Sequence, residues 1–305
     1  MRKTATSLVC AIVAGPLLHV PAQAAPPNSA TPQIRTYVSG GGRDTNPCTA
    51  TSPCQTFQAA LALTIAGGEI LVLDSANYGA FTINKAVSIT SEGAVAGVLA
   101  TSGAAVTINA GANDVIYLRG MDIDGGHAGA VGIQFTSGAS LNIQKSTVRA
   151  FANSGISFAP NAASSLFVSD IHVTGNANNG ILVSASGSNA VNAVLNRVTV
   201  SRNGVGIFAN GARANVTMTD TVAGNNSYGV GANSSAVMVR NSTLSNNTVG
   251  IAADQSATVL VGQSTITANG TGWTSMNNGK VQSYSNNNVS GNTVDGILTS
   301  TVSLK

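Results

Sequence analysis

Four ionisable residues near the middle of the chain could do acid–base chemistry. Asp122 and Asp124 lie two residues apart, Arg149 follows Asp124 by 25 residues, and His172 follows Asp122 by 50. Residues two apart in a strand point to the same face, so these intervals would gather the side chains if successive segments stack. Carboxylates beside Arg and His can transfer protons, or hold a cation against an acidic sugar. We therefore take these four residues as the candidate catalytic cluster.

The same cluster also has a structural interpretation. Two Asp residues separated by one apolar residue are common at a solvated strand edge, where Arg149 would pair with them across strands. A group of charges in a sequence does not by itself show a pocket. His127 adds one further titratable residue in the segment "GGHAG" that follows Asp124. At the level of sequence, both interpretations stay open.

The intervals between these residues belong to a longer repeat. Apolar residues recur at intervals of 25, 25, 27, 22, 22, 22 and 23, and they are Ile123, Val148, Val173, Val200, Val222, Leu244, Ile266 and Val289. A period of this length predicts a solenoid, in which each turn buries its apolar face against its neighbours. Charged residues make up only 8% of the chain, and Val, Ile, Thr, Asn, Ser and Gly dominate, which favours strands and turns. We therefore expect an all-β chain of stacked parallel coils, with repeat coils over residues 115–305.

A row of asparagines follows the apolar anchors in nearly the same register. Its members are Asn176, Asn203, Asn225, Asn247, Asn269 and Asn292. An Asn at a fixed place in each coil can hydrogen-bond the equivalent Asn above and below, and the backbone of the turn as well. We predict that this row is a structural ladder, because a buried polar group normally serves to satisfy hydrogen bonds.

A row of outward-facing residues lies on the strand that precedes each anchor. It contains Tyr117 and Phe167, and Arg119 and Arg240 stand two places beyond this row in their own coils. The row is less polar than an exposed sheet face usually is. Aromatic side chains beside Arg could stack on and pair with a sugar acid, so we predict these four as substrate-binding residues. The alternatives are contact with a partner subunit and packing by a loop of the same chain.

The first part of the chain divides into three segments. Residues 1–24 combine a basic start, an apolar run and an Ala-Gln-Ala ending, which is typical of a cleaved signal peptide. Residues 25–34 are rich in Pro and polar residues and are expected to be a flexible lead-in. Residues 35–114 would hold an N-terminal cap and the first coils. Export predicts a secreted, periplasmic or cell-surface protein, with no membrane span after the signal.

The N-terminal cap is expected to contain a short helix and a disulfide. Phe57, Ala60, Leu61 and Ile65 stand at helical spacing within residues 53–67, and two glycines follow them. A helix there could cover the exposed apolar end of a stack of strands. Cys48 and Cys54 lie six residues apart, and in an exported chain they are expected to form a disulfide. A zinc site would need more ligands, so we expect no metal and no cofactor.

The charge balance bears on possible partners. Without residues 1–24 the chain has 12 Lys and Arg against 11 Asp and Glu, a net charge of +1. Phosphate binding needs a dense basic patch, so nucleic acid is not an expected partner. A polysaccharide is compatible with such a surface. The sequence leaves the oligomeric state open.

One long segment carries a family resemblance. "CQTFQAALALTIAGGEILVLDSANYGAFTINKAVSIT" (residues 54–90) resembles the opening of secreted proteins of the pectin-lyase-like superfamily. Asn77-Tyr78-Gly79 and Ile83-Asn84-Lys85 stand where that opening has a turn and a strand. The resemblance implies a right-handed parallel β-helix with a short N-terminal capping helix, and the crossover rule for parallel strands agrees with this handedness. It does not imply one activity, because the superfamily includes lyases, hydrolases, epimerases and adhesins.

The motifs of the superfamily's known enzymes are incomplete in this sequence. Gly126-His127 only approaches the Gly-His-Gly of polygalacturonases, and the Asp-Pro-His-Glu pattern of alginate epimerases is absent. Acidic residues are too sparse for the calcium ligands of pectate lyases. The first functional hypothesis is therefore a secreted protein that binds carbohydrate or acts as a surface module without catalysis. The alternatives are a polysaccharide lyase or glycoside hydrolase that uses the catalytic cluster, and an adhesin or assembly module.

Overall fold

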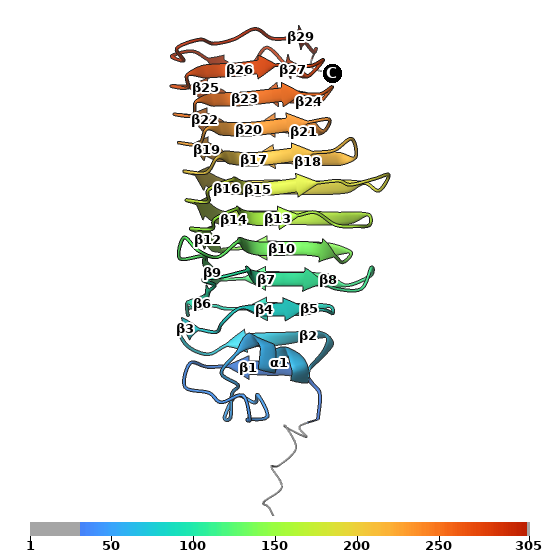
Figure 1. The fold of residues 1–305 in the computed structure, drawn as a ribbon, viewed down its shortest axis with the longest axis vertical. Coiled ribbons are helices and arrows are strands. Elements are labelled where there is room, and N and C mark those ends of the chain that lie inside the picture. Colours follow the sequence, from blue (N-terminus) through green and yellow to red (C-terminus); the bar gives the residue numbers. More distant parts are fainter. Residues whose placement is uncertain (1–30, 304–305) are drawn as a thin grey trace, which may run out of the picture.

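The computed structural model describes residues 31–303, and these residues form one stack of parallel β-coils (Figure 1). The expected signal peptide and most of the lead-in lie outside the described residues. Within them, β1 already begins at Gln33, inside the segment expected to be flexible. The stack has the N-terminal cap at one end and the C-terminus at the other (Figure 1). Every strand pairing within the two sheets is parallel, as the sequence repeat predicts.

Each coil contributes strands to two sheets. The nine-stranded sheet, sheet C, faces the viewer in Figure 1 and consists of β4 (Phe81–Ile83), β7 (Ala104–Asn109), β10 (Val131–Ser137), β13 (Ser154–Phe158), β15 (Asn179–Ser184), β17 (Val205–Asn210), β20 (Tyr228–Asn233), β23 (Val249–Asp254) and β26 (Thr271–Ser275). The 20-stranded sheet, sheet A, wraps the remaining perimeter of the coils. Side chains from both sheets meet in one continuous apolar core.

Sheet A has two columns of strands. The first column contains β1 (Gln33–Val38), β2 (Thr64–Val72), β5 (Val87–Thr90), β8 (Val115–Arg119), β11 (Ser140–Gln144), β18 (Ala214–Thr219), β21 (Ala236–Arg240), β24 (Thr258–Gly262), β27 (Lys280–Ser283) and β29 (Ser300–Thr301). The second contains β3 (Ala76–Asn77), β6 (Ala96–Leu99), β9 (Met121–Asp124), β12 (Thr147–Arg149), β19 (Val222–Gly224), β22 (Thr243–Ser245), β25 (Thr265–Thr267) and β28 (Asn288–Val289). The longer strands β14 (Ser164–Thr174) and β16 (Val191–Ser201) run through both columns.

The apolar column of the second strands confirms the predicted stacking with one correction. Val148, Val173 and Val200 pair in register, and Leu244 pairs with Ile266. Between them Ala223, not Val222, pairs with both Val200 and Leu244. Ala223 is 0% exposed whereas Val222 is 43% exposed. The predicted anchor at Val222 is therefore wrong by one residue. Consequently Val222 points outward and lies beside Thr199 of the preceding coil.

Two corners of each coil are made by single residues in the left-handed backbone region. Between the first and second strands these are Gly120, Lys145, Asp170, Arg197, Asp220, Asn241 and Gln263, with φ from 46° to 74°. After the second strand they are Ala150, Gly175, Arg202, Asn225, Asn246, Ala268 and Gly291. One such residue turns a strand sharply without a longer loop, and only Gly, Asn and Asp adopt this region readily. The coils thus tolerate strain at fixed corners in order to keep their inner register.

The asparagine ladder is present, with one member corrected. Asn176, Asn203, Asn226, Asn247 and Asn269 each donate from Nδ2 to the Oδ1 of the next member, over 2.9–3.1 Å, and the last acceptor is Asn292. The backbone amide of each of these donors bonds the same oxygen. Asn225 was predicted for this ladder, but it occupies the left-handed corner position just before it. Because Asn225 and Asn226 are consecutive, the repeat alone does not show which of the two belongs to the ladder.

The N-terminal cap contains α1 (Phe57–Leu63), which is shorter than the sequence predicts. Thr56 caps the helix by accepting the Ala59 amide, and Phe57 and Leu61 are buried. The chain turns extended at Thr64 because β2 pairs with β1 from that residue onward. Ile65 is therefore a strand residue, 38% exposed, and not part of the helical core as predicted. Pairing with a neighbouring strand here overrides the local helical pattern.

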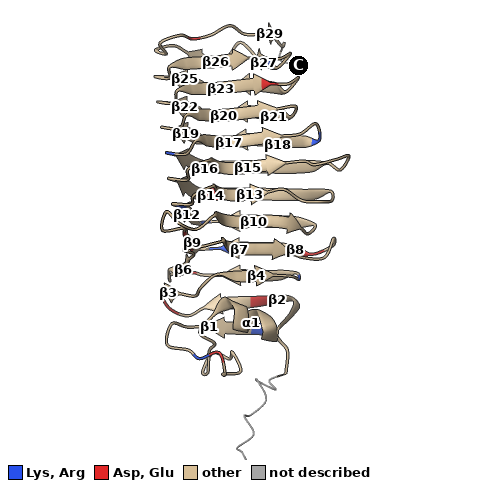
Figure 2. Cartoon of the chain, in the orientation of Figure 1, with Lys and Arg blue, Asp and Glu red and all other residues tan. Residues whose placement is uncertain are grey.

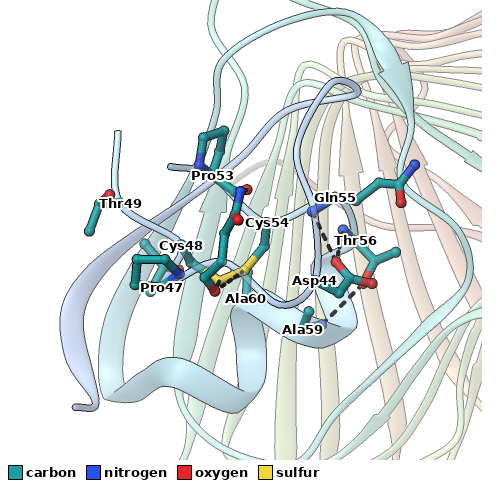
Figure 3. The surroundings of a disulfide bond; sticks show 12 residues. Asp44, Pro47, Cys48, Thr49, Pro53, Cys54, Gln55, Thr56, Ala59 and Ala60 are labelled. Atoms are coloured by element: carbon teal, nitrogen blue, oxygen red, sulfur yellow. Dashed lines mark hydrogen bonds between the residues drawn. A yellow bond between two sulfur atoms is a disulfide. The ribbon is translucent and has the colours of Figure 1, made fainter. Parts of the chain in front are cut away.

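The disulfide lies beside α1 (Figure 3). Cys48 and Cys54 are bonded, their Cα atoms are 4.6 Å apart, and both are fully buried. Asp44 fixes the start of the helix by accepting the amides of Gln55 and Thr56, each at 2.9 Å (Figure 3). The predicted disulfide is thus confirmed, and it closes a small loop that packs on the end of the core.

Candidate functional site

The structure brings three of the four predicted catalytic residues together on sheet A. Asp122 and Asp124 on β9 pair with Thr147 and Arg149 on β12, so the guanidinium lies directly over the two carboxylates. Arg149 Nε donates to Asp124 Oδ2 at 2.9 Å, and its two terminal nitrogens bond the Asp122 carboxylate. These bonds raise the pKa of Arg149. The three side chains form a partly exposed ion-pair cluster.

His172 stands apart from this cluster. It pairs with Thr147, which in turn pairs with Asp122, so His172 lies two coils from Asp122. The side chain of His172 is exposed. One guanidinium engages both carboxylates, so the arrangement matches a paired strand edge better than two free acid–base groups. The four residues lie on neighbouring strands of sheet A in the predicted register. Within the described residues, however, His172 makes no hydrogen bond to the other three.

A hollow of about 640 Å³ lies beside the cluster, at the corner between the first and second strands. Its charged lining residues are Glu92, Arg119, Asp122, Lys145 and Arg149. Arg119 is held by Glu92 Oε1 at 3.1 Å and by Gln144 Oε1 at 3.0 Å. The backbone amide of Lys145 donates to Ser169 O at 3.2 Å, but its ammonium makes no hydrogen bond or ion pair within residues 31–303. Arg197 chiefly, and the Lys145 ammonium to a smaller extent, lower the pKa of Asp170. The ammonium of Lys145 is thus the cation that this hollow offers to a ligand.

Lys145 and Glu92 line this hollow but were not predicted as site residues. Lys145 belongs to the left-handed corner column, whose members vary in type from coil to coil. A period search that follows apolar anchors passes over such a column. The available signal was its constant place, two residues before the first outward residue of the second strand.

The outward row on the first strands is confirmed in register. Tyr117 pairs with Asn142, Asn142 with Phe167, and Phe167 with Val194. We call these four residues the aromatic column. Tyr117 and Phe167 are 49% and 47% exposed and stand two coils apart, roughly 10 Å at the usual strand spacing. No loop of the described chain covers these rings.

Polar side chains border the aromatic column. Arg119 and Gln144 lie two places along from Tyr117 and Asn142 and are paired in register. A small hollow of about 200 Å³ beside Tyr117 is lined by Arg119, Asn142 and Gln144 among others. The column therefore combines half-exposed rings with hydrogen-bonding groups on one side.

Arg240 occupies the same register position as Arg119, in a coil much farther along the stack. The register runs through five coil steps, so the two are separated by roughly 24 Å. Arg240 donates to Gln263 Oε1 at 3.0 Å and lines a different hollow, of about 790 Å³, together with Tyr284. The four residues predicted to bind substrate thus divide into a group of three and a distant Arg240.

Residues 31–303 contain neither a candidate metal centre nor a helix that could span a membrane. They contain no group of three or more His, Cys, Asp or Glu residues placed to hold a metal ion. None of their helices is long and apolar enough to cross a bilayer. The side chains of the candidate site itself offer cations, paired carboxylates, amides and aromatic rings.

Comparison with known proteins agrees with this architecture. Residues 188–304 match the family described as right handed beta helix region. A solved structure of the pectate lyase Pel9A superposes with a TM-score of 0.64 at 14% identity, covering 90% of this chain and 80% of that one. The Azotobacter vinelandii mannuronan C-5 epimerase AlgE6 A-module gives 0.51 at 16% identity, covering 78% and 90%. No curated protein matches the sequence. The fold is thus a right-handed parallel β-helix, and the likeness to these solved structures concerns the fold alone.

Proposed function

We propose that this protein binds a polysaccharide chain that lies across the coils on the aromatic column. The observation that carries the proposal is the pair of half-exposed rings, Tyr117 and Phe167, which project from one face two coils apart. A large aromatic ring left in water forfeits the stabilisation that burial would bring, on the order of 2 kcal/mol. Two such rings in one column therefore mark a surface that a partner covers.

The surroundings of the rings favour a sugar as that partner. A sugar ring has an apolar face and a rim of hydroxyl groups, and binding sites combine apolar walls with a few placed polar groups. Asn142 stands between the two rings, and Arg119 and Gln144 border them. Lys145 adds an unpaired cation at the neighbouring corner, so an acidic sugar unit is favoured there over a neutral one.

A glycan array probed with the protein, followed by variants, tests the proposal. Tyr117→Ala and Phe167→Ala are each expected to weaken binding at least about fivefold, since an aromatic contact contributes about 1 kcal/mol. Leu260→Ala is the matched control, because Leu260 lies in the same outward row four coils beyond Phe167. Binding that survives both aromatic changes, or that falls equally in the control, would contradict the proposal.

Catalysis on such a chain is the second candidate function. The unpaired Lys145 beside the Asp122–Arg149 ion pair supports it, since a cation near a sugar carboxylate could stabilise charge that develops during reaction. The test is an assay for unsaturated products and new reducing ends on pectin and alginate. Activity lost in Lys145→Ala, with binding retained, would establish it. Binding without any product would remove it.

We also propose that the mature protein acts outside the cytoplasm. The disulfide between Cys48 and Cys54 supports an oxidising compartment, because cytoplasmic thiols are kept reduced. Fractionation of cells that express the full chain tests this. Accumulation of the protein in the cytoplasm with free thiols would contradict it.

A further inference from the structure

A further hollow lies on sheet C, on a face that the proposed polysaccharide site does not use. We propose that this hollow binds a single neutral sugar ring. The residues that form it, called the Phe208 cradle, are Phe208, Tyr228, Gly231, Asn233, Ala252 and Asp254. They come from three successive strands, β17, β20 and β23. The volume of the cradle is about 200 Å³, below the range of drug-sized pockets and suited to one ring.

The floor of the cradle is a gap in a column of larger side chains. Leu182, Phe208, Gly231 and Ala252 follow one another in register on the outward face. Gly231 has no side chain, and the Phe208 ring leans into that space: a Cβ at Gly231 would lie 3.1 Å from Phe208 Cδ2. Ala252 continues the floor with a single methyl group. The Phe208 ring therefore covers Gly231, and the hollow lies beside that ring and over Ala252.

The walls of the cradle are apolar and exposed. Tyr228 lies in the neighbouring outward column, which pairs it with Val205 and Val249, and it is 38% exposed. Met276 follows β26 (Thr271–Ser275) and lines the opposite end of the cradle. A ring that enters the cradle would thus contact Phe208 and Tyr228 with its apolar face.

Two polar side chains stand side by side at the rim. Asn233 and Asp254 pair in register, so they lie one coil apart, about 4.8 Å. Asp254 Oδ1 accepts from Gln255 N and from Asn277 Nδ2, both at 2.8 Å. In the described part of the chain, Asp254 Oδ2 and Asn233 Nδ2 make no hydrogen bond. The rim thus offers one free acceptor and one free donor, a combination that suits neighbouring hydroxyl groups of a sugar.

The charge of sheet C decides which sugars fit. Among the nine strands of this sheet, Asp254 is the one charged residue, and it colours the end of β23 in Figure 2. Asp254 makes no ion pair in the described part of the chain, although Lys280 follows Gly279 at the neighbouring corner. Its carboxylate at the rim repels sugar acids. The cradle therefore selects neutral rings, whereas the corner hollow with Lys145 favours acidic ones.

A second copy of this chain is the competing occupant. A contact of this face with itself would bury Asp254 against an uncharged sheet, and an unpaired buried charge is costly. A hydroxylated ring leaves the same carboxylate hydrogen-bonded and partly in water. The charge distribution accordingly favours the sugar.

Calorimetric titration with neutral oligosaccharides tests the inference in a Tyr117→Ala/Phe167→Ala background, which removes the aromatic rings of the first site. The probes are cellohexaose, maltohexaose, mannohexaose and galactotetraose, with hexagalacturonate as the charged comparator. We expect one neutral probe to bind more tightly than about 10 mM. Tyr228→Ala, and Ala252→Leu, which fills the floor, should each weaken it at least about fivefold. Leu182→Ala, one coil before Phe208, should leave it unchanged.

The outcomes separate this inference from the proposed function. If the wild type binds a neutral probe, keeps that binding with Ala252→Leu and loses it in the Tyr117→Ala/Phe167→Ala variant, the cradle would be overturned and a single site favoured. Absence of binding by every neutral probe up to about 10 mM would overturn it as well. So would a concentration-dependent dimer, detected by sedimentation, that Tyr228→Ala dissolves. Tighter binding of neutral probes in Asp254→Ala would remove the role assigned to the rim.

Discussion

Asn226 and Asn225 show how much one position along the chain changes the role of a residue. Asn226 is 4% exposed, accepts the amide of Asn203 and donates to Val200 O and Asn247 Oδ1. Asn225, next to it, has φ 59° and contributes no side-chain hydrogen bond to the described structure. One residue satisfies buried backbone groups and the other makes a corner, although their types are identical.

These two residues give a matched pair of variants. Asn226→Ala removes the acceptor of the buried Asn203 amide and one donor to the Val200 carbonyl, so we expect the free energy of unfolding to fall by about 3 kcal/mol. Asn225→Gly keeps the left-handed corner and should change it by less than about 0.5 kcal/mol. Urea denaturation followed by circular dichroism measures both. Equal losses in the two variants would contradict the register of the ladder.

Asp74 links stability to pH near the N-terminal end. Its carboxylate accepts from Ser39 Oγ, the Gly40 amide and Tyr78 Oη, and these bonds lower the pKa of Asp74. Because the pKa is lower in the folded than in the unfolded chain, its stabilising contribution is complete above the unfolded value of about 3.9. The contribution is lost as the pH falls through the folded value.

The Asp74→Asn variant tests this linkage. At pH 7 the variant is expected to melt at a lower temperature than the wild type, because the charged acceptor is gone. As the pH falls below the unfolded value and through the lowered folded pKa of Asp74, the wild-type carboxyl becomes neutral, and the two melting temperatures should approach each other. Thermal scans at a series of pH values measure the difference. A gap that stays constant from neutral to acidic pH would show that the charge of Asp74 does not contribute.

At the scale of elements, local patterns competed with pairing between coils. The strands were predictable because β-branched residues alternate inward and outward at a constant period, as at Thr265, Ile266 and Thr267. The helix was predicted too long because Ile65 continues its apolar spacing. In the structure, the chain from Thr64 onward forms β2, which pairs with β1. Short strands next to corners, such as β19, were misplaced by one residue for the same reason: only the neighbouring coil fixes them.

The cap is the element whose stability the disulfide should control. The double variant Cys48→Ala/Cys54→Ala removes a crosslink that spans six residues, and the loop-closure model gives a loss of about 2 kcal/mol. The loop packs on α1 at one end of the stack, so opening of the cap should accompany the loss while the distant coils stay folded. Hydrogen exchange resolved by residue measures this. Uniform loss of protection from cap to C-terminus would contradict a local role.

At the scale of the whole molecule, the parallel stack gives each face its own chemistry. Side chains repeat once per coil, so a change of residue type along one file creates a local site without a change in the fold. The aromatic column, the corner hollow and the Phe208 cradle each arise in this way. The repeat let the sequence place Tyr117, Phe167 and the Asp122–Arg149 pair. It could not show that Lys145 and Glu92 share a hollow, because corners and loops follow no apolar period.

The central claim is that a polysaccharide lies across β8, β11 and β14 on the aromatic column. The most direct measurement is amide chemical-shift mapping by NMR of the protein titrated with the glycan selected on the array. We expect the shifted amides to cluster around Tyr117, Asn142 and Phe167. Shifts confined to the ends of the stack, or spread over sheet C with these three residues unmoved, would contradict it.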